Sequence, residues 1–155
     1  MESIDLLTLA SRWAHISAAI VAIGGAAFQL LALRPASESV LDAEEHARLR
    51  DAIRVRWSRI VFGCIFVLLL TGFANFYFLV LAPKIPPKPY HWFFGPKVLL
   101  AFFVFFIASA LAGRSPGLAR MRAKSSTWLA LLIVLGAAIV LVSGLLSQIR
   151  AGAGS

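Results

Sequence analysis

The stretch TWLALLIVLGAAIVLVSGLLSQ, residues 127–148, decides the fold, because it carries no charged side chain over its whole length. In a helix it would span about 33 Å at 1.5 Å per residue, and the hydrocarbon core of a bilayer is about 30 Å thick. Three further apolar runs of similar length lie at 12–33, 59–82 and 91–112. The chain is 60% hydrophobic and 14% charged, whereas soluble domains are about 25% charged. The sequence therefore predicts one domain, an all-α integral membrane protein with a four-helix transmembrane bundle.

Lysine and arginine residues orient the predicted spans. Most of them lie in two connections, 34–58 and 113–126, whereas the opposite side carries only Lys84, Lys88 and Arg150. Cytoplasmic connections hold the excess of basic residues in membrane proteins. We therefore expect a bacterial-type cytoplasmic (inner) membrane, both Arg-rich connections in the cytoplasm and both termini outside. The net charge of +8 is therefore explained by membrane topology. It gives no reason to expect a nucleic-acid partner.

The connection 34–58 is expected to be a cytoplasmic helical extension that begins near residue 41 and runs into the second span. Acidic residues come early in it and arginines late, which is the order that a helix dipole favours. Glu44 and Arg48 form an i,i+4 pair. Ser39 is the expected N-cap, and His46 is expected on a solvated face of the helix.

Prolines precede the third span. The outer connection 83–89 contains four of them, a composition that predicts a stiff extended link and no helix. Pro96 is then the expected first residue of the membrane helix, because proline is favoured at that position.

Polar groups inside the spans mark the candidate site, since they are costly in a bilayer. Counting inward from the tryptophans at the span ends puts one polar group of each span near one level in the outer leaflet. These groups are His15, Asn75, Lys97 and Ser143. Thr71 lies one turn deeper than Asn75 on the same helix face, and Gln29 lies toward the inner side. The spacing thus predicts an outer-leaflet polar layer.

Each of these groups has more than one interpretation at this point. His15 is a metal or haem ligand, or it has a proton-handling role, or it only hydrogen-bonds a neighbouring helix or a backbone carbonyl. Lys97 faces a bound group, or it extends to the headgroups. Asn75 and Thr71 fit interhelical hydrogen bonding, and His91, at the outer interface, could reach the layer.

Small residues on the first span admit two explanations as well. Ala18, Ala22 and Ala26 recur every four residues beside Gly24 and Gly25. Such residues let helices approach closely, and they would also make room for a flat cofactor.

The available residue types favour haem over copper. One histidine can supply the axial ligand of haem b in a pocket that is otherwise apolar and aromatic, and the chain has 12 Phe. Copper prefers clustered Met, Cys and His, but Cys64 and Met121 fall on the cytoplasmic side, far from His15. All seven Asp and Glu precede residue 52, which argues against a carboxylate relay inside the bilayer.

Several short segments resemble a known membrane family. They are RWAHISAAIVAIGG at 12–25, LRPA at 33–36, RWSRIV at 56–61, LTGFAN at 70–75, FGPKVLL at 94–100 and AGR at 112–114. Together they resemble the copper-resistance D (CopD-like) membrane domain over residues 7–148, and this resemblance implies copper uptake or tolerance. The pattern is also loosely similar to the HemJ-like protoporphyrinogen oxidases, which bind haem b. That similarity implies His15 as axial ligand and Lys97 as a base facing haem or substrate.

Three functions stay open from the sequence. The leading one is a CopD/HemJ-like membrane protein that binds a redox cofactor or metal, with haem b favoured, at His15, Lys97 and Asn75. The second is copper uptake or handling, with His15 and His91 as metal ligands. The third is a non-catalytic membrane subunit or assembly partner whose polar layer only joins helices. Whether the chain is an enzyme is open, and its expected partners are the lipid bilayer and a second copy or partner subunit.

Overall fold

The computed structural model of the chain describes the backbone of residues 2–80 and 87–152 and the side chains of residues 6–77 and 95–145. The elements are α1 (Glu2–Phe28), η1 (Gln29–Leu33), α2 (Arg34–Val40), α3 (Ala43–Val80), α4 (Pro87–Ala112), η2 (Pro116–Leu118), α5 (Ala119–Ala123) and α6 (Ser125–Gly152). The described chain is helical almost throughout and has no strand. Four of its helices are long and apolar enough to cross a membrane. The predicted all-α four-helix bundle is therefore confirmed.

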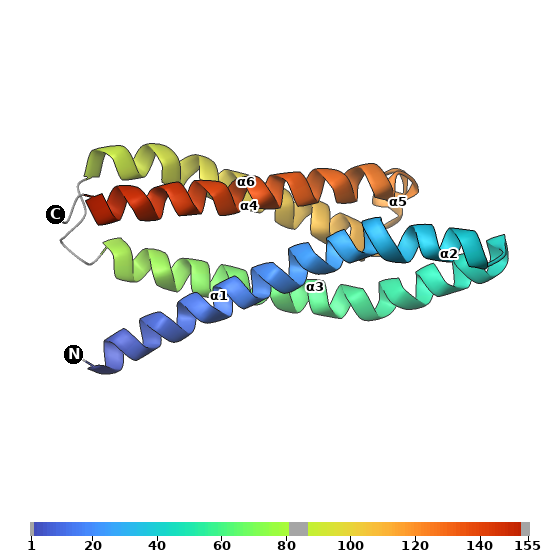
Figure 1. The fold of residues 1–155 in the computed structure, drawn as a ribbon, viewed down its shortest axis with the longest axis horizontal. Helices are drawn as coiled ribbons and strands as arrows, with labels where there is room; N and C mark the ends of the chain where they lie inside the picture. Colours follow the sequence, from blue (N-terminus) through green and yellow to red (C-terminus); the bar gives the residue numbers. More distant parts are fainter. Residues whose placement is uncertain (1, 81–86, 153–155) are drawn as a thin grey trace.

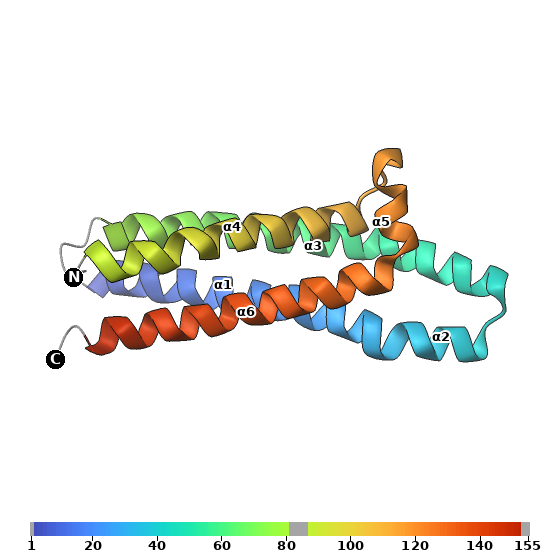
Figure 2. The same cartoon turned by 90° about the horizontal axis from the view of Figure 1, so that it is seen from above.

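The four long helices form two closely packed pairs. α1 packs along α3 and α4 packs along α6, while smaller contacts of α3 with α4 and of α1 with α6 join the pairs (Figures 1 and 2). The start of α1 and the end of α6 lie at one end of the bundle, called here the terminal end. At the other end, called the hairpin end, α2 and the first part of α3 project beyond the remaining helices.

Helices form both sides of the hairpin end. α1 continues through η1 into α2, and α3 runs unbroken from Ala43 to Val80. The expected helix that runs into the second span is thus present. Its N-cap is Asp42 and not Ser39. The Asp42 carboxylate accepts hydrogen bonds from the backbone N–H groups of Glu44 and Glu45, at 2.9 and 2.8 Å. The Ser39 hydroxyl instead donates to the Ala36 carbonyl within α2, because α2 has not yet ended at that residue.

The prolines before the third span are partly helical, contrary to the sequence prediction. α4 begins at Pro87 and includes Pro89, while Pro83 and Pro86 lie outside the described residues. Proline is tolerated in a first helical turn because the N–H that it lacks would have no partner there. Pro96 is inside α4 and does not start it. Lys97 consequently sits well within a continuous helix.

Large apolar side chains face outward along the bundle, and the inside is built from smaller ones. Leu99 and Leu141 are more than 70% exposed, whereas Ala26 and Ala110 are at most 3% exposed. Ile107 is the largest fully buried side chain and lies in a cluster with Ala26 and Leu132. This distribution fits a protein whose outer surface meets lipid, because lipid solvates apolar side chains and the helices associate through close packing.

Two glycines mark where helices approach most closely. A Cβ at Gly25 would overlap the indole ring of Trp57 on α3, and a Cβ at Gly136 on α6 would lie 2.9 Å from Cδ1 of Ile23 on α1. A Cβ at the adjacent Gly24 would meet nothing within 4 Å. The close-packing explanation for the small residues of the first span therefore holds at Gly25.

Replacing Gly25 by Ala is expected to destabilise the bundle by about 1–3 kcal/mol, because the added methyl group displaces the Trp57 ring. Equilibrium unfolding in mixed micelles measures the effect, with Gly24→Ala as the neighbouring control. Equal stabilities of the two variants would contradict the packing of Trp57 on Gly25. In a Trp57→Ala background, the cost of Gly25→Ala should disappear.

Candidate functional site

A cavity of about 1230 Å³ lies among the helices and is lined by residues from both ends of the bundle. Pockets for small molecules typically measure about 300–1,000 Å³, so this one is large. At the terminal end the polar lining residues are Thr8, Arg12, His15, Asn75 and Lys97. Further along, the walls are apolar and aromatic, with Phe102 and Phe105 from α4 among them. The cavity thus joins an apolar interior to polar groups of the predicted layer.

His15 is held by a hydrogen bond from α1 to α3. Its Nδ1 lies 2.8 Å from the hydroxyl oxygen of Thr71. That hydroxyl is also 2.6 Å from the carbonyl oxygen of Val67 in its own helix. A carbonyl can only accept, so the single hydroxyl proton of Thr71 is committed to Val67. Toward His15 the hydroxyl can then only accept, and the proton of this bond is carried by Nδ1.

This assignment determines the chemistry of the other ring nitrogen. In a neutral imidazole with the proton on Nδ1, Nε2 carries a lone pair. His15 is half-buried and lines the cavity, while Thr71 is buried behind it. Gly72 lines the same wall, and even a Cβ there would be 3.8 Å from Cε1 of the ring. A histidine that binds a metal through one nitrogen usually donates its other N–H to a fixed acceptor, and His15 has that arrangement.

A second polar contact joins the same two helices one turn away. The Ser11 hydroxyl donates to Oδ1 of Asn75 at 3.2 Å. Ser11 and His15 are four residues apart on α1, and Thr71 and Asn75 are four apart on α3, so the two bonds form a short ladder. The sequence analysis missed Ser11, although its spacing from His15 places it on the same face. The two bonds of the ladder show which faces of α1 and α3 meet at this level.

The remaining predicted residues divide in their placement. Lys97, on α4, is half-buried and lines the terminal end of the cavity, as His15 does. Ser143 does not join the layer. Its hydroxyl donates to the Ile139 carbonyl of its own helix at 2.6 Å, and the residue does not line the cavity. Gln29 lines the cavity at the first residue of the π-helical turn η1. The side chain of His91 lies outside the described residues.

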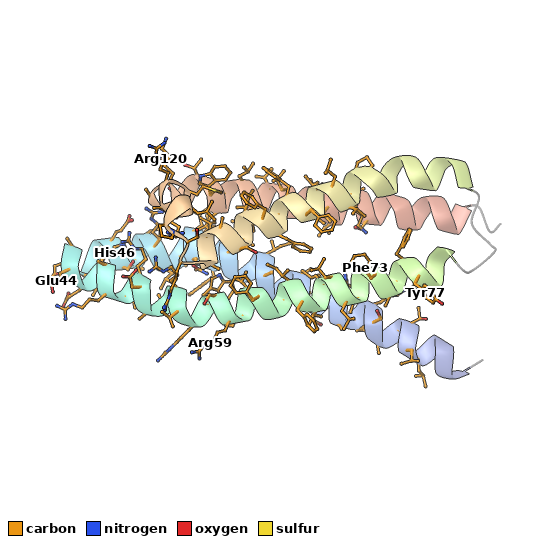
Figure 3. The ribbon with its side chains drawn as sticks, turned by 180° about the vertical axis from the view of Figure 1, so that it is seen from behind. Glu44, His46, Arg59, Phe73, Tyr77 and Arg120 are labelled. Atoms are coloured by element: carbon orange, nitrogen blue, oxygen red, sulfur yellow. The ribbon has the colours of Figure 1, made fainter. Side chains whose placement is uncertain are left out.

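His46 is not the solvated residue that its helix position suggested. It is half-buried, lines the cavity at the hairpin end, and its Nδ1 lies 3.0 Å from the hydroxyl of Ser37 on α2 (Figure 3). The reason is that α2 folds back beside α3 and covers this face. Within the described side chains, no three His, Cys, Asp or Glu residues come together as a metal site. A multi-ligand metal centre therefore has no support from these side chains.

Comparisons of the chain with protein-family models, with curated proteins and with solved structures gave no match. The resemblance to CopD-like and HemJ-like proteins consequently stays a hypothesis.

Replacing Thr71 by Val is expected to destabilise the bundle by about 1–2 kcal/mol, since it leaves the Nδ1–H of His15 without its acceptor in an apolar interior. Ser143→Ala is the control. Its hydroxyl also donates to a carbonyl four residues earlier, but it makes no hydrogen bond to another helix among the described residues. Unfolding of both variants in the same micelles tests the difference, and an equal loss for the two would rule out a special role for the bond between helices.

Proposed function

We propose that this chain is an integral membrane protein that binds haem b, with Nε2 of His15 as an axial ligand. The observation that carries the proposal is the hydrogen bond of His15 to Thr71, which keeps the proton on Nδ1. Nε2 is then available for iron beside a large cavity.

The residues around His15 suit such a cofactor. A haem pocket is mainly apolar, and the phenylalanines that line this cavity are Phe73, Phe76, Phe102 and Phe105. Arg12 and Lys97 line the same end as His15, and their positive charges suit the two propionates of a haem. A single histidine meets the minimum that haem requires, whereas copper would call for several sulfur and nitrogen ligands. The donor set therefore favours haem over the copper alternative.

Bound haem would supply one-electron chemistry. The protein's own groups have three tasks in this proposal. Thr71 orients the imidazole of His15 and increases its strength as a ligand, because the Nδ1–H donates to the hydroxyl oxygen. The aromatic walls keep water from the iron, and Asn75, bonded to Ser11, holds α1 against α3 at the level of the ligand.

The proposed orientation places the protein in a bacterial-type cytoplasmic membrane, with the hairpin end in the cytoplasm and the terminal end outside. The excess of Arg and Lys in connections 34–58 and 113–126 supports it. His15 then faces the outer half of the bilayer.

An optical spectrum of the purified protein from haem-replete cells tests the cofactor. We expect a Soret band that shifts and sharpens on reduction with dithionite, and that is lost in His15→Ala because the iron loses its axial ligand. His46→Ala is the matched control, since His46 lines the same cavity and also bonds a hydroxyl through Nδ1. A colourless wild-type protein, or equal loss of the band in both variants, would contradict the assignment.

Cysteine labelling in whole cells tests the orientation. In a Cys64→Ala background, a cysteine placed at Ser115 should react with a membrane-impermeant maleimide only after the cells are broken. A cysteine placed at Lys84 should react in intact cells. The reverse pattern would place the arginine-rich connections outside.

A further inference from the structure

The hairpin end of the cavity carries a concentration of positive charge that the proposed haem site does not use. Four arginines line it, from three different elements: Arg34 on α2, Arg50 and Arg54 on α3, and Arg122 on α5. Arg34 lies 19 residues after His15 along a nearly continuous helix, which is about 28 Å at 1.5 Å per residue. The arginines are therefore too distant to serve the ligand end of the cavity.

These charges are only partly compensated by the protein. Arg34 pairs with Glu38 at 2.9 Å, and Arg54 contacts Asp51 at 3.3 Å. Neither carboxylate lines the cavity, and among the described residues that do line it none is acidic. The acidic partners thus hold the arginines from outside, and the cavity wall itself stays positive.

Two of the guanidinium nitrogens have no hydrogen-bond partner among the described residues. Nε of Arg54 and Nη1 of Arg122 are buried and make no hydrogen bond to the described residues. Arg122 is held in place through its Nη2, which donates to the Ser115 carbonyl at 2.7 Å. Buried polar groups are nearly always hydrogen-bonded, and a charged donor left unpaired is especially costly. Both nitrogens belong to arginines that line the cavity, so two charged side chains there have donor capacity that the described residues leave unused.

Neutral polar groups complete this end. Ser125 lines it and accepts a hydrogen bond from Nη1 of Arg34 at 3.3 Å, which links α6 to α2. His46 and Ser37 line it as well. By the argument used for His15, Ser37 donates to the Arg34 carbonyl at 3.0 Å, so Nδ1 of His46 carries the proton and its Nε2 is left for another partner.

We propose that the arginine end of the cavity binds the phosphate group of an anionic molecule. A phosphate offers several acceptor oxygens in different directions, and arginine matches them with paired N–H donors. The arginines belong to three elements that line one end of the cavity, and a tetrahedral group can accept hydrogen bonds from several directions. The apolar cavity that continues from this end would hold a hydrocarbon portion, as in a membrane phospholipid, while a soluble phosphate would occupy the arginine end alone. The inference goes beyond the proposed haem site.

Ligand titration of the full-length protein by native mass spectrometry tests this. The probes are phosphatidylglycerol, phosphatidylcholine and inorganic phosphate. The double variant Arg54→Gln/Arg122→Gln removes two of the arginines that line the cavity. The control is Arg59→Gln/Arg120→Gln, which removes the same charge from the same two helices. Arg59 and Arg120 extend away from the bundle and do not line the cavity (Figure 3).

We expect the cavity variant to bind phosphatidylglycerol about tenfold more weakly or worse, because two charge-assisted donors are lost, and the control to change by less than about twofold. Tight binding of phosphatidylglycerol with no binding of inorganic phosphate identifies a lipid headgroup as the source. Binding of inorganic phosphate with the same dependence on the two arginines identifies a soluble phosphate. Equal weakening in both double variants, or no binding of either anion, would overturn the proposal.

Should the double variant fail to fold, Arg122→Lys provides a second test. This variant keeps the charge but loses the paired N–H donors of arginine. We expect it to bind phosphatidylglycerol several-fold more weakly. An unchanged affinity would contradict the proposed site. The same titration on His15→Ala protein separates the two proposals. Anion binding should persist there whether or not the wild-type protein carries haem.

Discussion

The hydrocarbon of a bilayer offers no hydrogen bonds, and the rest of this structure depends on that constraint. Backbone groups satisfy one another within four long helices. Polar side chains inside the spans have the same need, and most of them meet it within the chain. Ser143 bonds its own helix, whereas His15 bonds Thr71 on the neighbouring one. The difference matters, because a bond within a helix leaves that helix free to rotate, and a bond between helices determines which faces meet.

Close approach at some points and open space at others follow from side-chain size. Gly25 admits the Trp57 ring, and Gly136 admits Ile23, so α1 is drawn against both α3 and α6. The two helix pairs meet less closely than the helices within each pair, and the cavity lies among them. Small residues at the crossings thus bring helices together, while phenylalanines line the space that remains among them.

The two ends of this cavity have different chemistry. At the terminal end, one imidazole with a fixed tautomer presents a lone pair beside Lys97 and Arg12. At the hairpin end, guanidinium groups from several elements line the cavity, and two of them carry a nitrogen with no partner among the described residues. A wall that is basic at both ends and apolar between them suits anionic molecules with a large apolar part. Haem and a membrane phospholipid share that character.

The sequence by itself determined the helices and the spans, because apolar length is a local property that needs no partner. It also determined that His15, Asn75 and Lys97 stand near one level, since position along a helix follows from counting residues. Only the tertiary structure decided that Thr71 and not Ser143 meets the histidine, that Asp42 caps α3, and that His46 and four arginines line the cavity. The physical reason is rotation about the helix axis. Spans that are apolar on all sides carry little information about which face turns inward, and contacts between helices supply it.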